Sequence, residues 1–159
     1  MNKSEIPTPQ KAALSMLLDD HRKVKKIFSD FKTEKDASRK QSMVNEACHD
    51  LTVHTQIEEQ QFYPFLRDQD EKTFGDLLDE ALVEHNSAKI LISELQKMAP
   101  DDELYDAKFT VLGEYVNHHV KEEENEIFPK VVSKKIDLRE LETTMRQLKE
   151  ELKSEAASH

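Results

Sequence analysis

The chain has 159 residues, of which 36% are hydrophobic and 35% are charged, and it contains only two glycines and five prolines. This length is typical of a single domain, and the composition favours long helices with solvated outer faces. The formal net charge of −10 argues against nucleic acid or an anionic membrane as a partner, since both are bound by basic patches.

The chain begins with a polar lead, residues 1–8, which we expect to be flexible. Thr8 and Pro9 are typical of a helix start, and apolar residues then recur at three- and four-residue steps, as on one helix face. The same period resumes after a polar connector, where Ser38 is a candidate N-cap, and Pro64 lies near the end of this second pattern. Two further amphipathic segments and a shorter fifth one follow. The predicted helices cover roughly residues 9–33, 38–65, 73–98, 101–129 and 138–152.

The first four predicted helices are joined by short connectors, including a polar turn at residues 67–72. Short connectors require neighbouring helices to run antiparallel, so we expect an all-α, up-down-up-down four-helix bundle. The bundle would span residues 9–132, and residues 136–159 would add an amphipathic helix and a tail.

An internal repeat relates the two halves of this predicted bundle. At an offset of 65 residues one His-x-x-x-Glu pair aligns with a second, and at an offset of 64 two lone histidines align. The chain is therefore built from two similar helical hairpins. The aligned residues are His54 and Glu58 with His119 and Glu123, and His21 with His85.

All six repeated side chains lie on the apolar seams of their predicted helices. One histidine on such a seam is more often a hydrogen-bonded core residue than a ligand, but four at similar heights are harder to explain in this way. A carboxylate in a core is costly unless it is paired or binds a cation, and no lysine or arginine shares the seam with either glutamate. Residues four apart project from one helix face, so each pair presents an imidazole and a carboxylate together.

These side chains suit two metal ions rather than one. Each glutamate can bridge the two ions, while two histidines bind each ion terminally. Six-coordinate ions would also need an oxo or hydroxo bridge and would keep positions open for a small ligand. Imidazole with carboxylate suits iron best, as Fe²⁺ or Fe³⁺, although zinc, manganese or cobalt could take its place. The predicted metal ligands are His21, His54, Glu58, His85, His119 and Glu123.

The motifs around these residues resemble those of the hemerythrin-like, or HHE cation-binding, domain family. The matching segments are LLDDHRKV, HTQIEEQQFYP, VEHN and HVKEEENEIFP, all within residues 10–132. The resemblance implies an antiparallel four-helix bundle with a carboxylate-bridged di-iron centre. It also implies that the four histidines are terminal ligands and that the two glutamates are bridges.

The sequence departs from the oxygen-carrying members of that family in two places. Those members have a fifth histidine on the third helix, where Lys89 stands here. They also place the carboxylate of the fourth helix five residues after its histidine, which corresponds to Glu124. We prefer Glu123, because the repeat pairs it with the glutamate of the second helix, and we keep Glu124 as the reserve candidate. Tyr115 could line a ligand pocket or could be a core residue bonded elsewhere.

The site favours a binding protein, a non-haem di-iron domain that binds or senses dioxygen, or responds to iron or nitric oxide. Histidine-rich di-iron sites tend towards reversible oxygen binding, whereas ferritin-like sites with four glutamates activate oxygen. One alternative is an enzyme that consumes peroxide or dioxygen at an open iron position. Another is a structural bundle that holds zinc or manganese.

Location and partners are expected from weaker signals. The chain has no apolar segment typical of a signal peptide or a membrane span, and its single cysteine suits a reducing compartment. We therefore expect a cytoplasmic protein with a small-molecule ligand, and sensing would require an unidentified protein partner.

Overall fold

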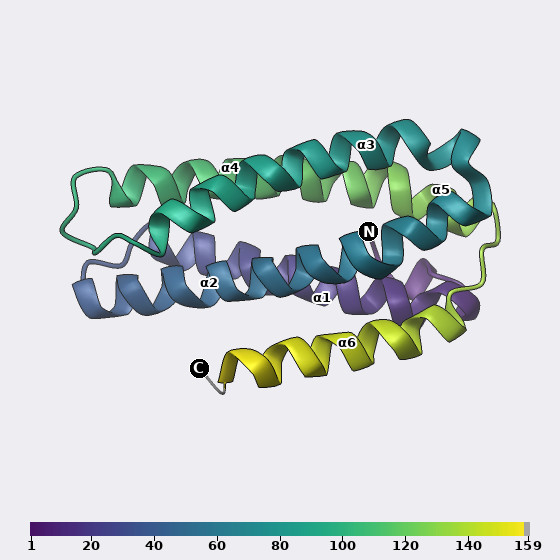
Figure 1. Ribbon diagram of the computed structural model, residues 1–159, viewed down its shortest axis with the longest axis horizontal. Coiled ribbons are helices and arrows are strands. Elements are labelled where there is room, and N and C mark those ends of the chain that lie inside the picture. The colour runs from purple at the N-terminus through teal and green to yellow at the C-terminus, as the bar shows by residue number, and fades with distance from the viewer. Residues whose placement is uncertain (158–159) are drawn as a thin grey trace.

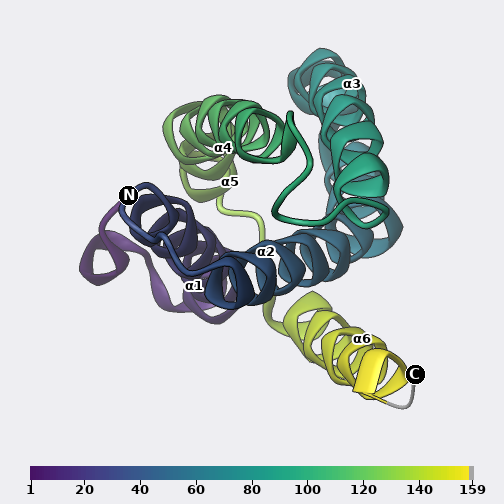
Figure 2. The same ribbon diagram turned by 90° about the vertical axis from the view of Figure 1, so that its left-hand side faces the viewer.

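The computed structural model describes residues 1–157, and within that range it contains helices and no strand. Four long helical rods run antiparallel side by side, and a fifth lies outside them (Figure 1, Figure 2). This confirms the predicted all-α, up-down-up-down bundle with an extra C-terminal helix. The last two residues of the predicted tail lie outside the described residues. In chain order the segments are η1 (Lys3–Glu5), α1 (Thr8–Phe31), α2 (Ala37–Ile57), η2 (Glu58–Phe62), α3 (Tyr63–Leu95), α4 (Tyr105–Glu122), η3 (Glu123–Ile127), α5 (Phe128–Ser133) and α6 (Arg139–Ala157).

The first rod is α1; the second consists of α2, η2 and the part of α3 before Asp70; the third is the rest of α3; and the fourth consists of α4, η3 and α5. A corner at Asp70 joins the second and third rods. The backbone is extended there, with φ −163° and ψ 81°. The Asp70 carboxylate accepts hydrogen bonds from the backbone N–H of Thr73 at 3.1 Å and from its hydroxyl at 2.7 Å, so it caps the third rod. The predicted polar turn at residues 67–72 is therefore wrong in extent, because helix continues past Pro64 up to this corner.

Two π turns, η2 and η3, interrupt the second and fourth rods at equivalent places. In η2 the backbone N–H of Tyr63 bonds to the carbonyl of Glu58, five residues earlier, and the same pattern closes η3. A proline stands two residues after the end of each π turn, where it would disturb a regular α-helix. An α-helix would place Phe62 one turn after Glu58, but the π turn gives that place to Tyr63.

Two local predictions at the start of the chain differ from the structure. Residues 1–8, expected to be a flexible lead, include η1, and the Ile6 side chain is only 4% exposed within the core. The cap of α2 is Asp36 rather than Ser38, because the Asp36 carboxylate accepts a hydrogen bond from the backbone N–H of Arg39 at 3.0 Å.

The core consists of two apolar clusters stacked along the bundle. On α1, Leu17 and Leu18 belong to one cluster, whereas Val24 and Phe28 belong to the other. His21 lies between them in the sequence, and it is buried. The interior of the bundle therefore changes from apolar to polar and back to apolar at the height of the predicted site.

The fifth rod, α6, packs on the outside of the bundle against α1, α2 and η2 (Figure 2). Its apolar side joins the first core cluster through Leu141, Met145 and Leu148. Its remaining faces are strongly charged, as the amphipathic pattern predicts. None of the helices among the described residues is sufficiently long and apolar to cross a membrane.

Candidate metal centre

The structure brings all six predicted ligand residues together inside the bundle. They come from all four rods: one from α1, one from α3, and a histidine and a glutamate from each rod that contains a π turn. All six side chains are buried, at exposed fractions of His21 4%, His54 5%, Glu58 0%, His85 3%, His119 8% and Glu123 0%.

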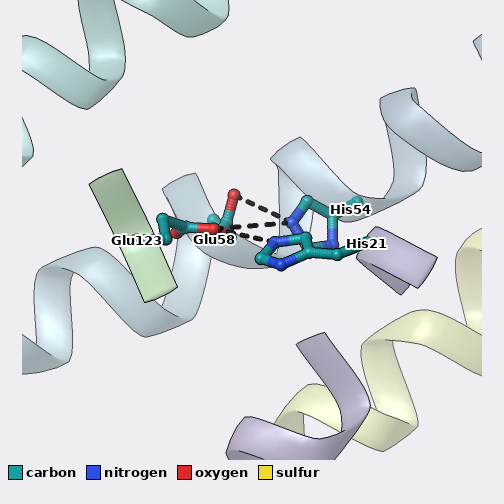
Figure 3. Close-up of side chains that lie close together, drawn as sticks. All are labelled: His21, His54, Glu58 and Glu123. Atoms are coloured by element: carbon teal, nitrogen blue, oxygen red, sulfur yellow. Dashed lines mark hydrogen bonds and ion pairs between the residues drawn. The ribbon is translucent and has the colours of Figure 1, made fainter. Parts of the chain in front are cut away.

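Four of these residues form one compact set, shown in Figure 3. One ligand atom from each of His21, His54, Glu58 and Glu123 lies within 4.8 Å of the others. The Nε2 atom of His21 is 3.0 Å from Oε1 of Glu123, and Nε2 of His54 is 3.2 Å from Oε1 of Glu58. Two imidazole nitrogens and two carboxylates thus face a common point.

A second set consists of Glu58, His85 and His119, again within 4.8 Å. The Nε2 atoms of the two histidines are 3.1 Å apart, and they lie 3.2 and 3.7 Å from Oε1 of Glu58. Oε1 of Glu123 is 3.6 Å from Nε2 of His119. Both glutamates therefore lie between the two pairs of histidines, as bridging carboxylates would.

The hydrogen bonding of these side chains fits a bound cation. Both carboxylate oxygens of Glu58 and the Nε2 atom of His54 are buried and make no hydrogen bond, although they approach each other as an ion pair. Buried carboxylate oxygens without donors are destabilising, and a coordinated cation offsets that cost. A donor set of four imidazoles and two carboxylates is one that transition metals accept.

Each of the four histidines turns its Nδ1 atom away from the centre, towards an outer carboxylate. Such a contact fixes the ring and leaves Nε2 for a metal ion. The Nδ1 partners are Glu124 for His21 at 3.0 Å, Asp20 for His54 at 2.9 Å, Glu59 for His85 at 2.9 Å and Glu84 for His119 at 3.4 Å.

The sequence analysis missed this outer layer, apart from naming Glu124 as a reserve ligand. Glu124 faces the outer side of His21, whereas Glu123 points into the centre. A signal was present in the sequence, because each outer carboxylate directly precedes or follows a predicted ligand, and the four align in the internal repeat.

Tyr63 is a further polar residue of the centre that the sequence analysis did not identify. Its hydroxyl donates a hydrogen bond to Oε2 of Glu123 at 2.8 Å and lies 3.4 and 3.3 Å from the Nε2 atoms of His85 and His119. The side chain is only 1% exposed. It points here because of the π turn, which an α-helical period does not anticipate.

The buried charges shift the pKa values of the centre in the metal-free protein. Burial lowers the pKa of His54, but Glu58 and Asp20 outweigh it and raise the value to about 10. Burial also opposes protonation of His21, but the hydrogen bonds that its ring donates to Glu123 and Glu124 again raise its pKa. Without metal, a proton on His54 therefore provides positive charge beside Glu58.

A cavity of about 40 Å³ adjoins the centre. All four histidines line it, and most of its other lining residues are apolar, including Leu51, Ala88, Ile92 and Val116. Tyr115 also lines it and is 44% exposed, so it is not a core residue. About 10–15 Å³ accommodates one water molecule, so the cavity has room for a small molecule only.

A buried group of histidines and glutamates at the middle of an antiparallel four-helix bundle defines a cation-binding helical bundle. The family model described as the hemerythrin HHE cation binding domain matches residues 12–131. The chain belongs to this family, as its motifs predicted.

Two other comparisons give one similar solved structure and one similar sequence. A solved structure of a hemerythrin HHE cation binding domain-containing protein from Mycobacterium kansasii has the same fold, with a TM-score of 0.73 over 91% of this chain and 88% of that one, at 19% identity. A DNA nickase from Nostoc sp. is 26% identical over 110 residues, which is 69% of this chain and 30% of that protein. The chain thus spans less than a third of the length of that relative.

Proposed function

We propose that the protein binds two iron ions in its core and uses them to bind or sense a small molecule such as dioxygen or nitric oxide. The observation that carries this proposal is the sharing of Glu58 between two donor sets. One ion would be held by His21, His54 and both glutamates. The other would be held by His85, His119 and the same glutamates.

The surroundings of the centre support a small-ligand site. Bound iron supplies a redox-active centre that can take an exogenous ligand. The outer carboxylates hold the Nδ1 protons, so that the four Nε2 atoms stay directed inward. The apolar cavity beside the histidines limits access of water and suits a diatomic molecule by its size.

A second candidate function is the consumption of peroxide or dioxygen, and Tyr63 favours it. Its hydroxyl lies beside both His85 and His119 and can supply a proton within the centre. The DNA-related name of the Nostoc relative supports no similar proposal here, because the formal net charge of −10 opposes binding to phosphates.

The test is to quantify metal per chain and to record absorption spectra of the reduced, air-exposed and peroxide-treated protein. Two irons with a reversible charge-transfer band support ligand binding, whereas rapid loss of peroxide supports the enzyme. A zinc or manganese protein that cannot take up iron contradicts both.

Three variants test the shared ligands directly. Glu58→Gln should weaken the binding of both ions, because Glu58 belongs to both donor sets. His85→Ala should release one ion and retain the other, because His85 belongs to only one set. Glu126→Gln removes the same charge from the exposed side of η3 and is the matched control. Two firmly bound irons in Glu58→Gln would show that the proposed ligand set is wrong.

A further inference from the structure

The C-terminal helix contacts the outer layer of the centre at one point. From the side of α6 that faces the bundle, Lys149 extends to Asp20 on α1, with 2.5 Å between Nζ and Oδ1. Both side chains are largely shielded, at 18% and 15% exposure. This ion pair is therefore less screened than one on an open surface.

The other oxygen of Asp20 continues the contact into the centre. Oδ2 accepts the hydrogen bond from Nδ1 of His54 at 2.9 Å, and Nε2 of the same ring faces Glu58. A carboxylate held by donors on both oxygens has little rotational freedom. A chain of contacts thus runs from α6, outside the bundle, through Lys149 and Asp20 to one histidine ring.

Among the described residues, none of a helix outside the bundle gives such support to the equivalent position in the other hairpin. There Glu84 contacts Nδ1 of His119 at the longer distance of 3.4 Å. Its second oxygen faces His118, which is 68% exposed, at 3.3 Å. Because α6 packs against α1 and α2, it brings its lysine to Asp20 in the first hairpin.

We infer that Lys149 is a positioning residue for the ion site that contains His54, and that α6 thereby makes the two ion positions unequal. This inference rests on the proposed metal centre. The position formed with His21 and His54 is the one whose geometry is fixed by a docked helix. The position formed with His85 and His119 depends on contacts within the four-helix bundle.

The first test is a titration of the metal-free protein with Co²⁺ alone, followed by its visible absorption bands. In Lys149→Met the affinity for one of the two ions should fall by about tenfold, which is the lower end of the effect expected for outer partners of metal-binding histidines. Lys149→Arg, which keeps the charge and the donors, should restore binding. Lys153→Met removes the same charge from the same surface groove and should bind Co²⁺ as the unmodified chain does.

The second test needs no metal. The Nδ1–H proton of His54 should give a downfield magnetic-resonance signal that is protected from exchange, identified by its absence in His54→Gln. Lys149→Met should broaden this signal, and Lys153→Met should leave it sharp. An unchanged signal in Lys149→Met would overturn the inference. An equal loss of Co²⁺ affinity in Lys149→Met and Lys153→Met would also overturn it. If the unmodified chain binds no Co²⁺, the proposed centre fails, while the signal still reports on Lys149.

Discussion

Tyr63 and Phe128 occupy equivalent positions in the two hairpins, and only Tyr63 carries a hydroxyl group. Tyr63 lies over the ring of His85 at 5.5 Å between ring centroids, and Phe128 lies over the ring of His21 at 6.0 Å. The Tyr63 hydroxyl donates to Oε2 of Glu123. The two halves of the centre thus share a scaffold, and the Tyr63 hydroxyl adds a polar group to one of them.

Removing that hydroxyl should destabilise the metal-free protein. Tyr63→Phe leaves a buried carboxylate oxygen of Glu123 without its donor, which costs about 1–3 kcal/mol. The free energy of unfolding, measured with urea after chelation, should fall by that amount. Tyr115→Phe makes the same change at a position that is 44% exposed and is the control. Equal stability of the two variants would contradict the role given to the Tyr63 hydroxyl.

The stability of the metal-free protein should decrease as the pH rises above neutrality. The pKa of His54 is about 10 in the folded chain, against an ordinary value of 6.5. A raised pKa contributes stability that is complete below about pH 6.5 and is lost as the pH rises towards 10. Urea unfolding between these limits should show the loss, and His54→Gln should reduce it. The free energy of unfolding of the metal-loaded protein should vary less with pH, because the ion replaces the proton. Equal pH dependence of the metal-free and metal-loaded protein would contradict this prediction.

Filling the cavity should block ligand binding without removing the metal. Ala88 lines the cavity beside the four histidines, so Ala88→Leu should occupy space that a small ligand needs. The affinity of the iron-loaded protein for azide should fall by about tenfold or more, which corresponds to ~1.4 kcal/mol. Ser93→Leu adds a similar volume on the exposed side of α3 and should bind azide normally. Normal azide binding by Ala88→Leu would exclude this cavity as the ligand site.

The backbone is strained at Lys135, in the connection between α5 and α6, and a substitution can remove this strain. Lys135 has φ 56°, a left-handed conformation that glycine adopts without a steric penalty. Lys135→Gly should raise the free energy of unfolding by up to about 1 kcal/mol. Lys134→Gly, next to it at an ordinary φ of −84°, should give no gain. Iron content should be the same in both variants.

The architecture and the central residues could be predicted from the sequence because the signals are long-range and redundant. Four amphipathic seams with short connectors permit few arrangements. The repeat then identified the histidines and glutamates that the structure brings together. Costly polar residues on apolar seams are conspicuous, since a core rarely accepts them without a partner.

The roles of the outer carboxylates and of Tyr63 do not follow from the apolar seams, although the repeat aligns the carboxylates. Asp20 and Glu84 stand beside the seam, where charged residues are ordinarily solvated, so their inward contacts are set by packing between rods. After Glu58 a regular α-helical period would give the place one turn further on to Phe62, whereas the π turn gives it to Tyr63, and Phe62 packs in the first apolar cluster. The corner at Asp70 lies within the predicted turn at residues 67–72, but its restriction to one residue could not be predicted, because the surrounding residues are all polar or helix-forming.

The π turn has a consequence for how the centre is encoded. Beyond Glu58, the direction of every side chain on the second rod depends on one additional residue of helix. If residues 58–63, with none deleted, formed regular α-helix instead of a π turn, Tyr63 and the residues after it would be rotated by about 100° from their present directions. The hydroxyl of Tyr63 would leave the centre although no side chain in it had been exchanged. Which side chains reach the centre therefore depends on the number of residues in one helical turn as well as on the kinds of side chain present.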